Sequence, residues 1–189
     1  MKSLTTFSTV TALLLTVFIT ACQPTKKEEG SADEAKQQNE ANLDRDEEKD
    51  AEFIVNTVSG SLNIIALAQL ALKKSTDQEV KSMAGMLEKD RIKILDELTT
   101  FAAKKGIASP TMQTSGAEID SNYLAESEGQ AFDEKWCKSL VNKYEKRIAK
   151  FERRSYKTDD MELKKWIDGT LPTLKSHLEM LKKQEEKGE

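Results

Sequence analysis

The chain has 189 residues, of which 33% are charged and 38% are hydrophobic, and its formal net charge at pH 7 is −4. This slight acidity, without aromatic residues interleaved in a basic surface, argues against a nucleic-acid partner. The length and the hydrophobic content suffice for one compact domain whose core does not need disulfides to hold it together.

The N-terminus has the pattern of an export signal. Lys2 precedes an apolar run at residues 10–19, which is too short for the ~20 residues of a membrane-spanning helix. The run ends in Ile-Thr-Ala-Cys, which resembles the bacterial lipobox, whose Cys becomes acylated. We therefore expect a lipoprotein signal peptide at residues 1–21, lipidation of Cys22, and an exported, membrane-anchored lipoprotein of the cell envelope. Ordinary signal cleavage that leaves Cys22 free is the alternative.

The segment after Cys22 is acidic. Residues 23–49 contain five basic and nine acidic residues and no aromatic residue. Such a segment buries too little apolar surface to offset its ordering entropy. We therefore expect residues 22–49, with the acylated Cys, to be a disordered acidic tether, and residues 50–189 to be the folded domain.

Three of the segments that follow carry apolar residues at helical spacing. The first helix is predicted at residues 50–74. The second starts behind a capping box of Thr76 and Glu79 and ends at Gly106, a residue type that favours helix ends. The third is predicted from about residue 130 to about residue 156.

A fourth helix, opened by Asp159, follows the third after a brief turn. Residues 108–126, between the second and third helices, contain few apolar residues, so we predict a long surface crossing there, with one short helical turn near residues 121–125. No segment alternates with period two, so no strand is expected. The pattern predicts an all-α fold, an antiparallel four-helix bundle with a long connection between helices two and three.

Four polar residues interrupt the apolar stripes near the middle of their helices, namely Asp90, Arg91, Tyr144 and His177. Bundles can build metal sites from carboxylates and histidines that project inward. A di-metal site needs several carboxylates and Glu-x-x-His pairs, which this chain lacks, and His177 is its only histidine. We therefore expect a hydrogen-bonded polar layer, in which Asp90 pairs with Arg91 or with the Tyr144 hydroxyl and a neighbour satisfies His177.

Cys137 has no partner for a disulfide once Cys22 is acylated. It lies beside Trp136 on a helical face. We therefore expect a buried small hydrophobic side chain there, with a reactive thiol as the alternative.

The predicted folded region resembles a widespread family of exported bacterial domains of unknown function, often labelled "predicted outer membrane protein" and assigned a ferritin-like fold. The matching stretches are DAEFIVNTVSGSLNIIALAQLAL, STDQEVKSMAGMLEKDRIKILDELTTFAAKKGI, FDEKWCKSLVNKYEKRIAKFE and DMELKKWIDGTLPTLKSHLEML, and LPTLKSHL is the most distinctive part. The resemblance implies a ferritin-like bundle and favours the outer membrane as its location.

Members of this family commonly have a Glu on the first helix, Asp-His pairs on the second and third, and a His on the fourth. The corresponding positions of this chain hold Ile64, Asp90, Arg91, Lys143, Tyr144 and His177. The resemblance thus leaves Asp90 and His177 as remnant metal-ligand candidates. A guanidinium cannot bind a metal, so we expect Arg91 to take the place of the cation and to neutralise Asp90, and we expect no metal or other cofactor.

These features favour a lipid-anchored envelope domain with a non-catalytic structural or interaction role. The chain lacks Ser-His, Cys-His and Gly-rich phosphate motifs, so we do not expect an enzyme. The alternative is a metal-linked oxidative or envelope stress protein with a vestigial ferritin-like site.

The third predicted helix also carries basic residues at steps of four and three. Most such stripes are solvated faces with acidic neighbours. The functional alternative is docking to an anionic envelope component, to a protein partner or to the chain's own acidic tether. This basic stripe consists of Lys143, Arg147, Lys150, Arg154 and Lys157.

Overall fold

The computed structural model describes residues 30–112 and 115–188. Within these ranges the chain forms six α-helices and no strand, which confirms the predicted all-α class. The four long helices are α2 (Arg45–Lys74), α3 (Gln78–Lys104), α5 (Gly129–Lys157) and α6 (Met161–Gly188), and the two short ones are α1 (Ala32–Asn42) and α4 (Ser115–Ala125). The predicted signal peptide and Cys22 lie outside the described residues.

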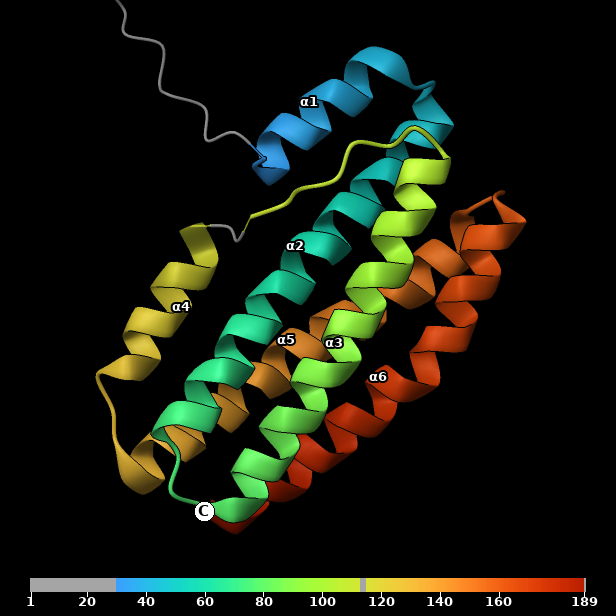
Figure 1. The fold of residues 1–189 in the computed structure, drawn as a ribbon. Helices are drawn as coiled ribbons and strands as arrows, with labels where there is room; N and C mark the ends of the chain where they lie inside the picture. Colours follow the sequence, from blue (N-terminus) through green and yellow to red (C-terminus); the bar gives the residue numbers. More distant parts are fainter. Residues whose placement is uncertain (1–29, 113–114, 189) are drawn as a thin grey trace, which may run out of the picture.

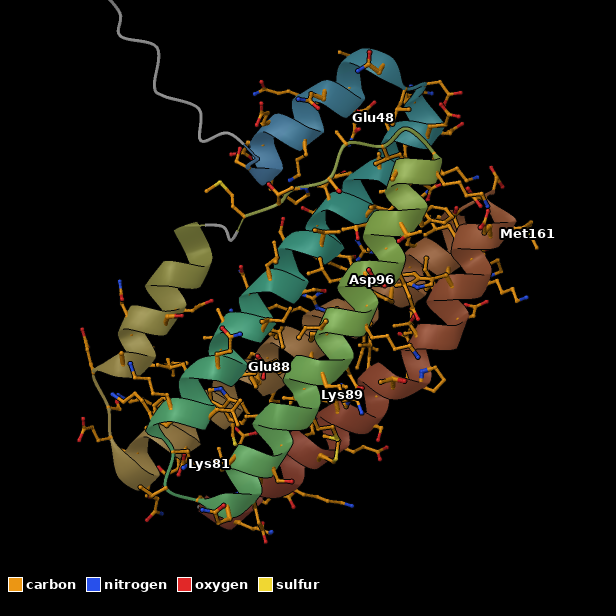
Figure 2. All side chains as sticks on the ribbon, viewed as in Figure 1. Glu48, Lys81, Glu88, Lys89, Asp96 and Met161 are labelled. Atoms are coloured by element: carbon orange, nitrogen blue, oxygen red, sulfur yellow. The ribbon has the colours of Figure 1, made fainter. Side chains whose placement is uncertain are left out.

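The long helices lie side by side as two hairpins, α2 with α3 and α5 with α6 (Figure 1). Residues 75–77 link the first pair and residues 158–160 link the second, so the helices of each pair run antiparallel. Helix α2 also packs against α5, and α4 lies along the outside of both. Side chains fill the space between the long helices (Figure 2).

Helix α5 supplies much of the core, because its apolar stripe faces inward over its whole length. Phe132 and Trp136 are fully buried, and Phe151 is 1% exposed. The Trp136 indole N–H donates to the Leu67 carbonyl oxygen of α2 at 2.8 Å. Burial of a large aromatic side chain stabilises the fold by about 1.5–3 kcal/mol, and the hydrogen bond satisfies its only polar atom.

Helix α2 is long and apolar enough to cross a membrane, judged by length and composition alone. However, 56% of its most apolar window is buried inside the structure. This burial is what a core helix of the bundle requires, because its apolar face must pack against its neighbours.

Residues 32–49 correct the expectation of a disordered tether, because they are helical up to Asn42 and again from Arg45. The side chain of Ser31 caps α1, and Asp44 and Glu47 form a capping box at the start of α2. Such caps satisfy backbone N–H groups at helix starts, a local stabilisation that average composition does not reflect.

Helix α1 is also held by a tertiary contact. Asn39 is 4% exposed, and its Nδ2 donates to the Ala108 carbonyl oxygen at 3.0 Å, while the Ala108 N–H donates to Asn39 Oδ1 at 2.8 Å. The folded unit therefore begins before residue 50, where the sequence had placed its boundary.

Three smaller predictions also need correction. The side chain that caps α3 is Asp77 and not Thr76, and Asp160 rather than Asp159 accepts the first N–H groups of α6. The crossing between the hairpins holds the full helix α4 instead of one short turn. Neighbouring Asp and Thr residues are all competent caps, so only the observed backbone path distinguishes between them.

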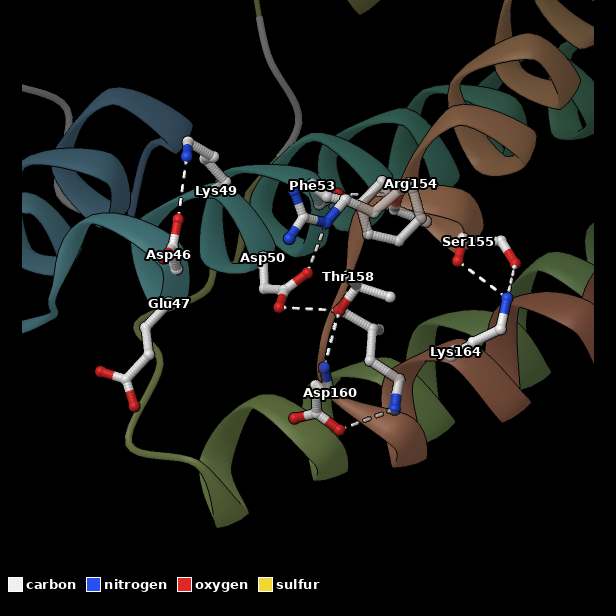
Figure 3. A network of polar contacts seen from close by, with 12 residues as sticks. Asp46, Glu47, Lys49, Asp50, Phe53, Arg154, Ser155, Thr158, Asp160 and Lys164 are labelled. Carbon is white, nitrogen blue, oxygen red and sulfur yellow. Dashed lines mark hydrogen bonds and ion pairs between the residues drawn. The ribbon is translucent and has the colours of Figure 1, made fainter.

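A polar network ties α2 to the link between α5 and α6 (Figure 3). Asp50 accepts hydrogen bonds from Arg154 Nε and, at 2.9 Å, from Thr158 Oγ1. Thr158 Oγ1 in turn accepts from the Asp160 N–H at 3.1 Å. Both oxygens of the Asp50 carboxylate are thereby satisfied at this end of the molecule.

Candidate functional site

The four residues of the predicted polar layer meet between α3, α5 and α6. Helix α3 contributes Asp90 and Arg91, α5 contributes Tyr144, and α6 contributes His177. Arg91 and Tyr144 are fully buried and His177 is 2% exposed, whereas the Asp90 side chain is 34% exposed to solvent. The structure thus brings all four together, with Asp90 at the solvent edge. We call these four residues the polar row.

Hydrogen bonds run through the polar row in one direction. Arg91 Nε–H donates to the Tyr144 hydroxyl oxygen at 3.2 Å, that oxygen lies 3.3 Å from His177 Nδ1, and His177 Nε2 lies 2.9 Å from Asp90 Oδ2. With the imidazole proton on Nε2, Tyr144 O–H donates to Nδ1 and Nε2–H donates to the carboxylate. We assign this tautomer because it gives the Tyr144 hydroxyl and the His177 N–H an acceptor each. Two neutral groups therefore connect a buried cation with a carboxylate.

The environment of His177 supports its neutral form. Burial lowers the pKa of His177, and the positive charge of Arg91 lowers it further, while the hydrogen bond to Asp90 partly offsets both effects. Burial disfavours the charged imidazolium because it loses solvation, and a nearby cation repels it. The imidazole is therefore neutral at pH 7, as the hydrogen bonds of the row require.

The partner of Asp90 differs from the expectation. The sequence predicted that Asp90 pairs with Arg91 or with Tyr144, but its partner is His177. Consecutive residues on a helix point about 100° apart, so Asp90 and Arg91 do not face each other. Arg91 lies over the Tyr144 ring instead, with Cζ 4.7 Å from the ring centroid, and both of its Nη atoms are enclosed without a protein partner.

The residues around the polar row do not fit a metal centre. Among the described residues, no group of three or more His, Cys, Asp or Glu side chains could hold a metal ion. The remnant candidates Asp90 and His177 are already bonded to each other, and Ile64 is fully buried with no donor atom. The guanidinium of Arg91 adds a fixed positive charge that repels a cation.

Cys137 is a buried small side chain, as predicted. It is 1% exposed, and burial raises the pKa of its thiol to about 12, with further contributions from Asp133 and other acidic residues. Because thiolate is the reactive form, such a thiol is inert near neutral pH.

The structure divides the basic stripe of α5. Lys143 pairs with Asp120 of α4, and Arg154 pairs with Asp50 of α2. The charges of these two residues are thereby balanced by protein carboxylates. Sequence reasoning could not find either partner, because each lies on another helix and far away along the chain.

Arg147 turns away from the rest of the stripe toward α2. Its guanidinium occupies the space above Gly60, where any Cβ would overlap it, and its Nη1 lies 3.4 Å from the Thr57 carbonyl oxygen. Its Nε is enclosed and has no partner in the part of the chain that the structure describes. Burial, followed by the positive charge of Arg91, lowers the pKa of Arg147 to about 9. The sequence signal for this contact was a glycine in the middle of an apolar helix.

Comparison with known proteins identifies a family and a fold. The family model described as "Domain of unknown function (DUF4142)" matches residues 32–183. A solved structure described as "CopM in the Cu(II)-bound form" is similar with a TM-score of 0.64 and 19% sequence identity, over 73% of this chain and 96% of that chain. At this identity the likeness shows the fold alone. No curated protein matches the sequence.

Proposed function

Because the chain belongs to the DUF4142 family of domains of unknown function, we propose that it is a lipid-anchored domain of the cell envelope with a non-catalytic structural or interaction role. The anchor is Cys22, the location is the outer membrane, and the long helices form a ferritin-like four-helix bundle. Support comes from the export signal and the lipobox-like sequence, and from the two antiparallel hairpins of the fold.

One observation carries the non-catalytic part of the proposal. A fully buried guanidinium, that of Arg91, lies where a ferritin-like site would place a metal ligand, and it is bonded to Tyr144. If one partner of a buried hydrogen-bonded row is lost, the remaining groups are left unpaired, and the fold loses much more stability than the intact row contributes. The role of the row is therefore to select one register of α3, α5 and α6.

A second candidate is a metal-linked envelope stress protein. It is favoured by the likeness to CopM in its Cu(II)-bound form. In that function the two remnant residues, Asp90 and His177, would bind the metal together with further ligands, and the hydrogen bond between them would open.

The test separates the two functions by restoring ligands. Full-length protein is prepared with copper, iron, manganese and zinc supplied, and bound metal and melting temperature are measured. We expect no stoichiometric metal in the wild type. The double variant Arg91→His/Tyr144→His places two imidazoles beside His177, and we expect it to bind about one equivalent with a raised melting temperature, since three histidines suffice for a metal site.

The matched control is Arg91→Gln/Tyr144→Phe, which removes the same groups without adding ligands and should gain no metal. Circular dichroism verifies that both double variants fold. One equivalent of metal in the wild type, lost in Asp90→Ala, would overturn the non-catalytic proposal in favour of the stress protein.

A further inference from the structure

A groove of about 440 Å³ lies between α2 and α5. Phe53 and Phe151 supply apolar surface, and Asn56 supplies a polar side chain from α2. Eight Lys and Arg side chains line the groove, against a single carboxylate, that of Glu52. In a chain whose net charge is −4, this is a local concentration of positive charge.

Only some of these cations are balanced by the protein. Lys49, Lys143 and Arg154 each pair with an aspartate. The other five have no ion pair within the described part of the chain. They lie close to one another along α5, and most of them are exposed to solvent. These five are Lys146, Arg147, Lys150, Arg153 and Lys157.

Arg147 extends this charge to the floor of the groove. It is held over Gly60 and keeps an enclosed Nε without an acceptor. Arg91, which is fully buried and whose two Nη atoms have no partner among the described residues, adds to the positive field at Arg147. The groove therefore combines exposed cations that have no ion pair within the described residues with a partly buried guanidinium held against Gly60, which an ordinary solvated basic face does not have.

We propose that this groove is a binding site for a ligand that carries two or more phosphate groups. A phosphate monoester carries about −1.5 to −2 charges at neutral pH and three acceptor oxygens, so two or three such groups balance five cations. From Lys146 to Lys157, α5 rises about 17 Å, at 1.5 Å per residue, which is room for several phosphates in a row. The guanidinium of Arg147 matches the geometry of phosphate oxygens.

Clustered phosphates occur in soluble oligophosphate compounds and in lipid headgroups. A flat bilayer meets the exposed lysines of the rim, whereas Arg147 lies against Gly60 of α2 and its Nε is enclosed. We therefore assign the groove to a soluble ligand. This assignment does not depend on the role proposed for the polar row.

The test is calorimetric titration of full-length protein with inorganic tripolyphosphate at low ionic strength, where charge interactions are least screened. We expect 1:1 binding that weakens as salt is added. Lys146→Gln/Lys150→Gln removes two rim charges and should weaken binding about tenfold, the effect of two charge-assisted contacts. The matched control Lys89→Gln/Lys93→Gln removes two exposed charges at the same spacing from α3 (Figure 2 labels Lys89) and should change the affinity less than about twofold.

A second variant tests the contribution of Arg147, whose guanidinium lies against Gly60, without changing any charge. Gly60→Ala adds a methyl group where the Arg147 guanidinium lies, so the guanidinium must move, and we expect weaker binding in a protein whose circular dichroism is unchanged. The proposal is overturned if tripolyphosphate does not bind, if the α3 control loses as much affinity as the rim variant, or if Gly60→Ala binds as the wild type does. Binding to phosphatidylglycerol vesicles alone would also overturn it, in favour of a membrane-docking surface.

Discussion

Arg91 shows at the scale of one residue how a charged side chain is accommodated in a core. It is fully buried and has no carboxylate partner among the described residues, and removal of a guanidinium from water costs several kcal/mol. The face of the Tyr144 ring and the Tyr144 hydroxyl offset part of this cost. The row then extends to Asp90 through His177, so an opposite charge lies at its other end.

The lowered pKa of His177 predicts a pH dependence of stability. In the unfolded chain a histidine titrates near its ordinary pKa of about 6.5, so below this pH the unfolded state binds a proton that the folded state does not. The free energy of unfolding should therefore be unaffected by His177 above that pH, and should fall as the pH drops toward the lowered pKa of the folded protein.

Urea unfolding of wild type and His177→Gln between pH 7.5 and pH 5 measures this effect, with glutamine retaining an N–H donor for Asp90. His177 is the only histidine, so the difference between the two proteins isolates its contribution. Parallel pH profiles would contradict the prediction.

Among the elements, helix α1 packs against α2 and is also held by one pair of hydrogen bonds. It is short and mostly polar, and an isolated helix of this length is marginal in water. The paired hydrogen bonds between Asn39 and Ala108 attach it to the segment after α3. Because the family match begins at residue 32, this attachment belongs to the domain.

Asn39→Ala should release α1. The variant leaves the partly buried Ala108 N–H and carbonyl oxygen without these partners, which costs at most about 1–3 kcal/mol. We expect faster amide hydrogen exchange across residues 32–42 and little change in α5. The control is Asn42→Ala, whose exposed side chain bonds only within its own helix, to the Gln38 carbonyl oxygen. Equal exchange in both variants would show that the Asn39 contact does not hold α1.

The whole molecule separates its charges. The acidic N-terminal segment and the acidic chain as a whole contrast with the basic groove between α2 and α5. With the proposed acyl anchor at Cys22 and the proposed ligand in this groove, the chain would hold an anionic ligand near a membrane without embedding any helix, since acyl chains alone would provide the attachment.

Replacement of Cys22 tests the anchor. Cys22→Ser should remove labelling by a clickable fatty acid and shift the protein from the membrane fraction to the soluble fraction, because serine lacks the thiol that is acylated. Cys137→Ser is the control. The Cys137 side chain is buried inside the domain, so this substitution should leave the fractionation unchanged. A Cys22→Ser protein that stays labelled and membrane-bound would exclude lipidation at this position.

The all-α class, the four long helices and the polar residues on their inner faces were predictable from the sequence, because apolar periodicity and capping are local properties of the chain. The choice among adjacent residues was not: Asp90 pairs with His177 instead of Arg91, and Asp77 caps α3 in place of Thr76. The order of α1 and the contact of Arg147 with Gly60 were also decided by tertiary structure. The partner of Asp90, the attachment of α1 and the position of Arg147 depend on the rotation and spacing of neighbouring helices, which bring together residues far apart in sequence. A local signal such as Gly60 does not identify the residue that will contact it, and the cap at Asp77 depends on the backbone path.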